Sequence, residues 1–146
     1  MTDAAIVSVA RTPIGKAYRG AFNNLEAPSL GAVPILAAVE RAGIDPAEVD
    51  DVIMGCAMPQ GTQFPNIGRL TALAAGLPTT VGGMTIDRQC SSGLMSVATA
   101  AKQIMYDGMD TVVAGGVESI SLAQNEHTNT FRMIDPALVE LHPAAY

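Results

Sequence analysis

The apolar residues of the chain fall into short continuous runs, and stretches with a helical period separate them. Four runs are predicted to be strands. Residues 4–10 (AAIVSVA) and 51–57 (DVIMGCA) have the composition of strands buried on both faces, and residues 84–88 (MTIDR) and 111–114 (TVVA) follow as the third and fourth. Because helical stretches alternate with these runs, the pattern predicts an α/β fold with a mainly parallel sheet and helices on both of its faces.

Three helices are expected between the runs. The first extends from Ser29 toward Gly43 and contains Pro34, so it either begins nearer Val33 or is kinked. The second follows the capping residue Asn66 and stops at residue 76. The third covers about residues 91–107 and carries an apolar stripe of the kind that faces a core: Leu94, Val97, Ala98, Ala101, Ile104 and Met105. Its other side is filled by Ser96, Thr99, Lys102 and Gln103.

Charge and composition exclude several classes of protein. The 146 residues carry a formal net charge of −6 and no run of Lys or Arg, which argues against nucleic acid and anionic membranes as partners. No apolar stretch approaches the roughly 18 residues of a membrane span, and the N-terminus lacks the pattern of a signal peptide. Two cysteines make no disulfide scaffold, and with two histidines they match no metal-ligand spacing. We expect a cytoplasmic protein with reduced thiols and no metal.

Cys90 stands where the third predicted strand gives way to the third helix. The unpaired N–H groups at a helix N-terminus stabilise negative charge there by about 0.3–1 kcal/mol, and by up to about 2 kcal/mol in favourable geometry. That energy ionises a thiol only partly at neutral pH, so a nucleophile at this position still needs a histidine base. The small residues Ser91, Ser92 and Gly93 would let a flat substrate approach, and the N–H of Cys90 or its neighbours would face a developing oxyanion.

Other features near the expected sheet edge leave two interpretations open. A free cysteine is usually a small buried hydrophobe, which is one interpretation of Cys90 and the one we expect for Cys56. Gly115 and Gly116 follow the fourth predicted strand, together with Glu118 and Ser119. Ligands of α/β sheets bind beyond the strands' carboxyl ends, so the glycines either permit a close approach there or form a plain turn.

Five blocks of sequence, taken in order, resemble the thiolase family, that is, the acetyl-CoA acetyltransferases and 3-ketoacyl-CoA thiolases. The blocks are ARTPIGKAYRGAF, RAGIDPAEVDDVIMG, NIGRLTALAAGLP, TIDRQCSSGLMSVATAA and DTVVAGGVESIS. The polar stretch that follows contains FRMID, which resembles the start of the family's loop domain. The resemblance therefore implies a thiolase-like N-terminal half over residues 1–121 and the beginning of a loop domain over residues 122–146.

The resemblance also implies a chemistry. Cys90 would carry an acyl group as a thioester, in the thiolytic cleavage of 3-oxoacyl-CoA to acetyl-CoA or in the reverse Claisen condensation of acetyl-CoA. Such an enzyme of fatty acid metabolism and β-oxidation takes coenzyme A thioesters as substrates, needs no cofactor, and forms homodimers or homotetramers. The alternatives are another condensing enzyme of the superfamily, such as a 3-oxoacyl-carrier-protein synthase or a hydroxymethylglutaryl-CoA synthase, or a non-catalytic thiolase-like protein.

Two departures from the family's pattern stand out. Asp87 replaces the usual Asn three positions before the nucleophile. Its carboxylate either contacts an arginine such as Arg88 or Arg69 near a partner subunit, or is a neutral exchange with the same hydrogen-bonding reach. The family's base His, second catalytic Cys and water-orienting Asn belong to a second half, and neither His127 nor His142 sits in a matching motif. We therefore expect this chain alone to be inactive.

Overall fold

The computed structural model describes residues 3–146 and centres on a parallel sheet. Its three strands, in the order β2-β1-β3, are β1 (Asp51–Gly55), β2 (Met84–Ile86) and β3 (Val112–Gly116). Ile53 of β1 lies opposite Met84 on one side and opposite Ala114 on the other. The central strand is buried along its whole length, as its apolar composition requires in a sheet covered on both faces.

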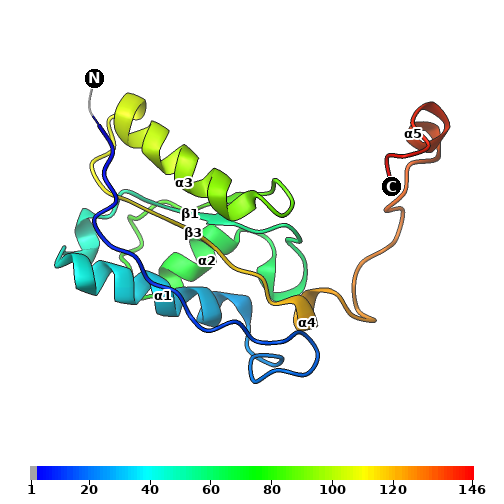
Figure 1. The fold of residues 1–146 in the computed structure, drawn as a ribbon, viewed down its shortest axis with the longest axis horizontal. Coiled ribbons are helices and arrows are strands. Elements are labelled where there is room, and N and C mark those ends of the chain that lie inside the picture. Colours follow the sequence, from blue (N-terminus) through cyan, green and yellow to red (C-terminus); the bar gives the residue numbers. More distant parts are fainter. Residues whose placement is uncertain (1–2) are drawn as a thin grey trace.

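Helices cover both faces of the sheet, which confirms the predicted α/β class. Figure 1 shows α1 (Ala27–Ala42) and α2 (Ile67–Ala74) on one side and α3 (Ser92–Lys102) on the other. The main core lies between α1, α2 and the sheet, where Ile35, Val39, Val52, Met54 and Ile67 pack together. Helix α1 begins earlier than predicted and continues through Pro34, and it ends at Gly43 in the left-handed conformation (φ 70°).

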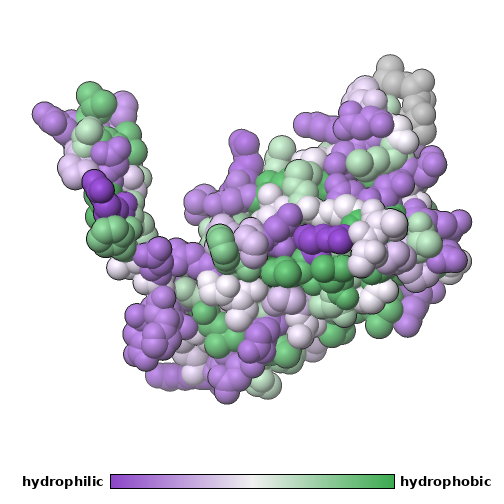
Figure 2. Space-filling model, turned by 180° about the vertical axis from the view of Figure 1, so that it is seen from behind, coloured by the Kyte–Doolittle hydropathy of each residue, from purple (hydrophilic) through white to green (hydrophobic). Residues whose placement is uncertain are grey.

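Shorter helices connect and extend these layers. They are η1 (Pro46–Glu48), η2 (Gly61–Gln63), η3 (Gln103–Asp107), α4 (Ile120–Ala123) and α5 (Pro136–Leu141). Helix α3 continues directly into η3, so the predicted helical span over residues 91–107 is nearly right. The arm that carries α5 stands apart from the body in both Figure 1 and Figure 2. Over residues 3–146, none of the helices combines the length and the hydrophobicity needed to cross a bilayer.

The prediction of a strand over residues 4–10 is wrong for this structure. The segment is irregular, and Ile6 and Val7 are 77% and 78% exposed. A run that is apolar on both faces forms a strand only when neighbouring strands and layers enclose it. Here the segment is held to α1 by one hydrogen bond, in which the guanidinium of Arg41 donates to the Val9 carbonyl at 2.8 Å.

The predicted inward face of the third helix is wrong as well. Small residues of α3 are buried against the sheet, namely Ser92, Ser96 and Ala100, whereas Leu94 is 75% exposed. Small side chains allow the helix axis to approach the sheet closely, and that contact outweighs the tendency of the larger apolar residues to turn inward. Part of the apolar stripe of α3 is consequently left without a partner in the described part of the chain.

Candidate active site

Cys90 is exposed in the loop that joins β2 to α3. Ser91 is the N-cap residue of α3, so Cys90 immediately precedes the helix, as the sequence predicted. The N-terminus of α3 points toward this loop at the carboxyl-terminal edge of the sheet, where parallel α/β folds bind their ligands. The position therefore combines access from solvent with the positive end of a helix dipole.

Hydrogen bonds within the loop fix the backbone on either side of Cys90. Gln89 adopts a left-handed conformation (φ 51°), which is unfavourable for a residue with a side chain. The carboxylate of Asp87 stabilises it by accepting a hydrogen bond from the Gln89 N–H at 2.8 Å. The N–H groups of Ser91 and Ser92 donate to the carbonyls of Arg88 and Gln89 at 3.2 and 3.0 Å. The loop is a tight turn that holds Cys90 at its tip.

The two serine hydroxyls strengthen the same turn. The Ser92 hydroxyl accepts from the Arg88 N–H at 2.8 Å and donates to the Gln89 carbonyl at 2.6 Å. The Ser91 hydroxyl donates to the Arg88 carbonyl at 2.8 Å and makes no capping bond to α3. Because the Ser91 and Ser92 N–H groups are used within the turn, they are poor candidates for the oxyanion donors that the sequence suggested.

Glycines let the first turn of α3 rest directly on the sheet. A Cβ atom on Gly55 would lie 2.3 Å from the Ser92 carbonyl carbon, closer than any stable contact. One on Gly116 would lie 3.3 Å from the Gly93 Cα atom. The sequence left open whether Gly115 and Gly116 permit a close approach or form a plain turn. At Gly116 the structure shows a close approach, and the approaching element is helix α3, which follows Cys90.

Ser96 ties this helix to β3, and the sequence analysis missed it. Its hydroxyl is buried and lies within hydrogen-bonding distance, 2.7 Å, of the carbonyl oxygens of both Gly93 and Gly115. The spacing of Ser92, Ser96 and Ala100 on one helix face was the signal available. Small residues at steps of four can mark a close helix–sheet contact as well as a solvated face.

Glu118 joins the ends of two strands beside the site. Its carboxylate accepts a hydrogen bond from the Ala57 N–H, which links the segment after β3 to the segment after β1. The neighbouring Ser119 is buried, and its hydroxyl donates to the Leu25 carbonyl at 3.0 Å. Glu118 and Ser119 thus hold loops at this edge of the sheet in place.

Cys56 is completely buried at the end of β1, in agreement with the packing role expected for it. Burial raises the pKa of its thiol to about 12, and the negative charge of the nearby Glu118 adds to the effect. A thiol with this pKa stays protonated at neutral pH, so Cys56 is unsuited to act as a nucleophile.

Iodoacetamide is expected to alkylate Cys90 and to leave Cys56 unmodified in the native chain at pH 7–8. The reason is that Cys90 is exposed, whereas Cys56 is buried and protonated. Peptide mapping by mass spectrometry measures both sites at once. Denaturation in guanidinium should remove the difference, and preferential labelling of Cys56 in the native chain would contradict the structure.

Asp87 makes no ion pair within residues 3–146. Arg69 is engaged elsewhere, because its guanidinium donates to the carbonyls of Thr79, at 2.9 Å, and Val81. The contact that Asp87 does make, with the Gln89 N–H, uses one carboxylate oxygen, which an asparagine amide also offers. Within this chain the structure therefore favours the interpretation that Asp87 is a neutral replacement of the family's usual Asn.

Asp87→Asn is expected to leave both stability and the alkylation rate of Cys90 unchanged. Asp87→Ala removes the acceptor that stabilises Gln89, at a cost of about 0.5–2 kcal/mol by analogy with lost helix caps. Urea denaturation measures the difference in the free energy of unfolding between the variants, provided that the free energy falls with urea concentration at the same slope in each. Equal stability of the alanine and asparagine variants would show that the turn does not depend on this hydrogen bond.

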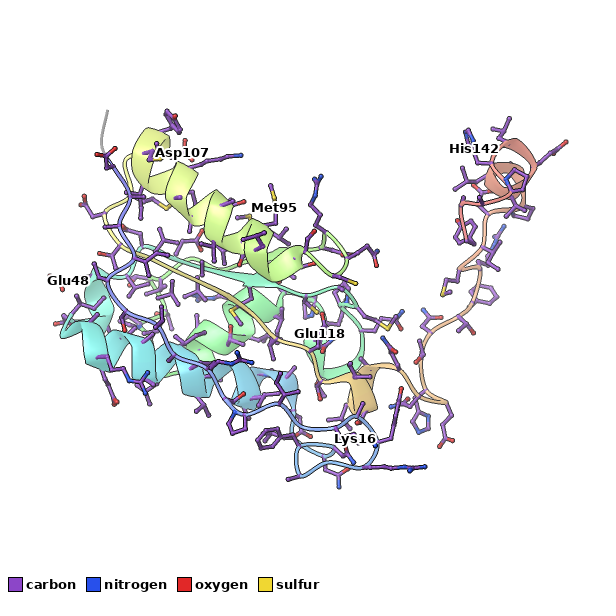
Figure 3. All side chains as sticks on the ribbon, in the orientation of Figure 1. Lys16, Glu48, Met95, Asp107, Glu118 and His142 are labelled. Carbon is purple, nitrogen blue, oxygen red and sulfur yellow. The ribbon has the colours of Figure 1, made fainter. Side chains whose placement is uncertain are left out.

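Neither histidine lies in the loop around Cys90. His127 is exposed and pairs with Glu126 at 3.6 Å. His142 follows α5 on the arm, and Figure 3 shows it well apart from Met95 in the first turns of α3. Within residues 3–146, no three His, Cys, Asp or Glu side chains converge as metal ligands do. The described residues thus supply an exposed thiol at a helix N-terminus without a neighbouring imidazole.

An exposed cysteine on a rigid turn at the ligand-binding edge of an α/β/α fold is an arrangement suited to covalent acyl transfer. Comparison with known proteins is consistent with it. The family model "Thiolase, N-terminal domain" matches residues 4–140. The chain belongs to the thiolase family.

Individual relatives support the same family assignment. The chain is 46% identical over 121 residues to a 3-ketoacyl-CoA thiolase of Bacillus subtilis, covering 83% of this chain and 31% of the relative. It is 46% identical over 143 residues to an acetyl-CoA acetyltransferase of Cupriavidus necator, covering 96% and 36%. The crystal structure of the Bacillus anthracis acetyl-CoA acetyltransferase superposes with a TM-score of 0.76 at 42% identity, covering 89% of this chain and 34% of that one. The chain thus spans about a third of the length of these relatives.

Proposed function

We propose that this chain is the nucleophile-bearing part of a thiolase-type acyltransferase and that Cys90 carries the acyl group. The observation that supports this most is the position of Cys90, exposed on a hydrogen-bonded turn immediately before α3. The names of the relatives, 3-ketoacyl-CoA thiolase and acetyl-CoA acetyltransferase, supply the reaction class.

In the degradative direction, the Cys90 thiolate attacks the 3-keto carbonyl of a 3-oxoacyl-CoA. The bond between carbons 2 and 3 then breaks, acetyl-CoA leaves as its enolate and takes up a proton, and the shortened acyl group remains on the sulfur. The thiol of free coenzyme A attacks this thioester and releases the shortened acyl-CoA and Cys90. Covalent transfer divides one difficult displacement into two easier ones. The reverse sequence condenses two acetyl-CoA molecules.

The chain supplies the nucleophile, the helix dipole and the rigid turn. We assign the proton transfers to groups on the remaining two thirds of a complete thiolase, because both histidines of this chain are outside the loop that holds Cys90. Substrates are coenzyme A thioesters, and no resident cofactor is required. We further propose that residues 1–121 form the N-terminal domain, that residues 122–146 begin the loop domain, and that the complete protein works in the cytoplasm.

A homodimer or homotetramer is proposed for the complete protein. Figure 2 shows apolar patches among polar side chains on the rear face of the body, as expected where further protein surface is to be covered. Light scattering of a complete thiolase containing this chain tests the assembly, and a stable monomer would contradict it.

The chain alone is expected to give no steady turnover of acetoacetyl-CoA. A chimera in which this chain replaces the matching segment of the Cupriavidus necator acetyl-CoA acetyltransferase is expected to be active, because it restores the missing acid–base groups. Spectrophotometric thiolysis assays of both proteins, at equal concentration, make the comparison. Turnover by the chain alone, or a folded but inactive chimera, would contradict the proposal.

A further inference from the structure

We propose that Tyr18 is a positioning residue for the acyl transfer, because it fixes the direction in which the chain leaves the body toward the arm that carries α5. The inference rests on the proposed function and adds to it a residue that is distant from Cys90 in the sequence. Tyr18 lies in the turns over residues 17–24, the N-terminal loop, which precede α1. Figure 1 shows this loop beside α4, where the arm begins.

Tyr18 adopts a strained conformation that long-range hydrogen bonds hold. Its φ angle of 64° lies in the left-handed region, which is unfavourable for a residue with a side chain, and its side chain is 58% exposed. Its N–H donates to the Ser121 hydroxyl at 2.8 Å, and its phenol hydroxyl donates to the Gln124 carbonyl at 2.9 Å. The Ser121 hydroxyl donates in turn to the side-chain oxygen of Asn23, in the same loop, at 3.0 Å. Since burial does not hold Tyr18 in this conformation, these bonds to α4 and the residue after it are the reason for it.

The phenol hydroxyl of Tyr18 ties down the C-terminal end of α4. The last carbonyls of a helix have no partner within that helix. The Ala123 carbonyl accepts a hydrogen bond from the Thr128 hydroxyl at 2.8 Å, a bond made within the departing segment, which is defined as residues 120–129. The Gln124 carbonyl is bound instead by Tyr18, which belongs to the body. Tyr18 therefore links the departing segment to the body.

The loop that follows β1 holds the departing segment as well. The side-chain oxygen of Gln60 accepts a hydrogen bond from the Asn129 N–H at 3.0 Å. A Cβ atom on Gly61 would lie 2.7 Å from the Leu122 carbonyl oxygen, so this loop and α4 are in close contact. The departing segment is thus fixed by two loops of the body, and its direction of exit is defined.

The departing segment leaves the body at the edge of the sheet where Cys90 lies. The three strands are parallel, so their carboxyl ends meet at one edge, and the Cys90 turn follows β2 as α4 follows β3. Ligands of such folds bind at this edge. In Figure 1 the arm rises from α4 on the side toward which the first turn of α3 points. A change in the direction of exit therefore moves the chain that borders an incoming coenzyme A thioester, while Cys90 and its turn stay in place.

Binding of coenzyme A to the chimera, measured by isothermal titration calorimetry before and after Tyr18→Phe, tests the inference. The substitution removes the phenol hydroxyl and keeps the ring. The Kd is expected to rise about three- to tenfold, which is the effect of one neutral hydrogen bond on an equilibrium. An unchanged Kd in a folded variant would overturn the inference, whether or not the chimera is active. The proposed function is judged separately, by turnover of the unsubstituted chimera.

Thiolysis kinetics distinguish positioning from a general loss of structure. Tyr18→Phe is expected to raise the KM for coenzyme A and to change kcat by less than about twofold, because acyl transfer at Cys90 is untouched. Tyr106→Phe is the matched control, since the Tyr106 side chain is 67% exposed and its hydroxyl makes no hydrogen bond within residues 3–146. It should change neither constant. An equal rise in KM in both variants, or a loss confined to kcat, would contradict the role of Tyr18.

Ser121→Ala gives a second test, because it removes the acceptor of the other hydrogen bond that Tyr18 donates to the departing segment. It should also raise the Kd of coenzyme A, and the double variant with Tyr18→Phe should show less than the product of the two effects, since both act through one contact. The alkylation rate of Cys90 should be the same in all these variants. Effects that multiply fully, or an altered alkylation rate, would contradict the inference.

Discussion

Cys90→Ala is expected to lower the thiolysis rate of the chimera by at least about 10⁴-fold, the order seen when a covalent nucleophile is removed. No other described residue offers an exposed thiol, because Cys56 is buried and its pKa is raised to about 12. The rate at which acetoacetyl-CoA disappears in the presence of free coenzyme A measures the loss of thiolysis activity.

Cys56→Ala is the matched control for this experiment. It removes the same group, a thiol, from the buried residue that follows β1. It should change the thiolysis rate only a few-fold while lowering the stability of the chain. If the two variants lose activity to the same extent, Cys90 has no special role and the proposed chemistry is wrong.

Gly55→Ala is expected to destabilise the chain by about 3 kcal/mol, at the upper end of the cost of overpacking. The added Cβ would meet the backbone of Ser92 at 2.3 Å, and backbone cannot rotate aside as a flexible side chain can. The first turn of α3 must therefore move off the sheet, and the turn that holds Cys90 must move with it. Urea denaturation gives the stability, and the alkylation rate of Cys90 reports on the turn.

Gly93→Ala tests whether the destabilisation by Gly55→Ala depends on the contact between Gly55 and the backbone of Ser92. Its Cβ would meet only the Gly116 Cα atom, at 4.0 Å, although Gly93 lies in the same first turn. This variant should keep the wild-type stability and alkylation rate. A Gly55→Ala chain as stable as the Gly93→Ala chain would show that the close helix–sheet contact is not essential.

The position of Cys90 was predictable because it depends on local signals. A short apolar run, a cysteine, two serines and a helical period lie next to one another in the sequence. The structure places Cys90 immediately before α3, as that order implies. The burial of Cys56 was predictable for the same reason, since it ends an apolar run that forms the central strand.

Other features depended on residues far apart in the sequence. The inward face of α3 is set by Gly55 and Gly116, which lie on strands distant from the helix in the chain. Residues 4–10 have the composition of a buried strand, but none of the three strands of the sheet pairs with them, so composition alone predicted a strand where an exposed segment is found. The hydrogen bond from Ala57 to Glu118 likewise joins segments 61 residues apart.

Detection of the acyl group on Cys90 tests the central claim most directly. The chimera would be mixed with acetyl-CoA, quenched in acid, digested and analysed by mass spectrometry. We predict one acetyl group on the peptide that contains Cys90, and its loss when free coenzyme A is added before the quench. An active chimera with no acetyl group on Cys90, or with the group on another residue, would contradict the account.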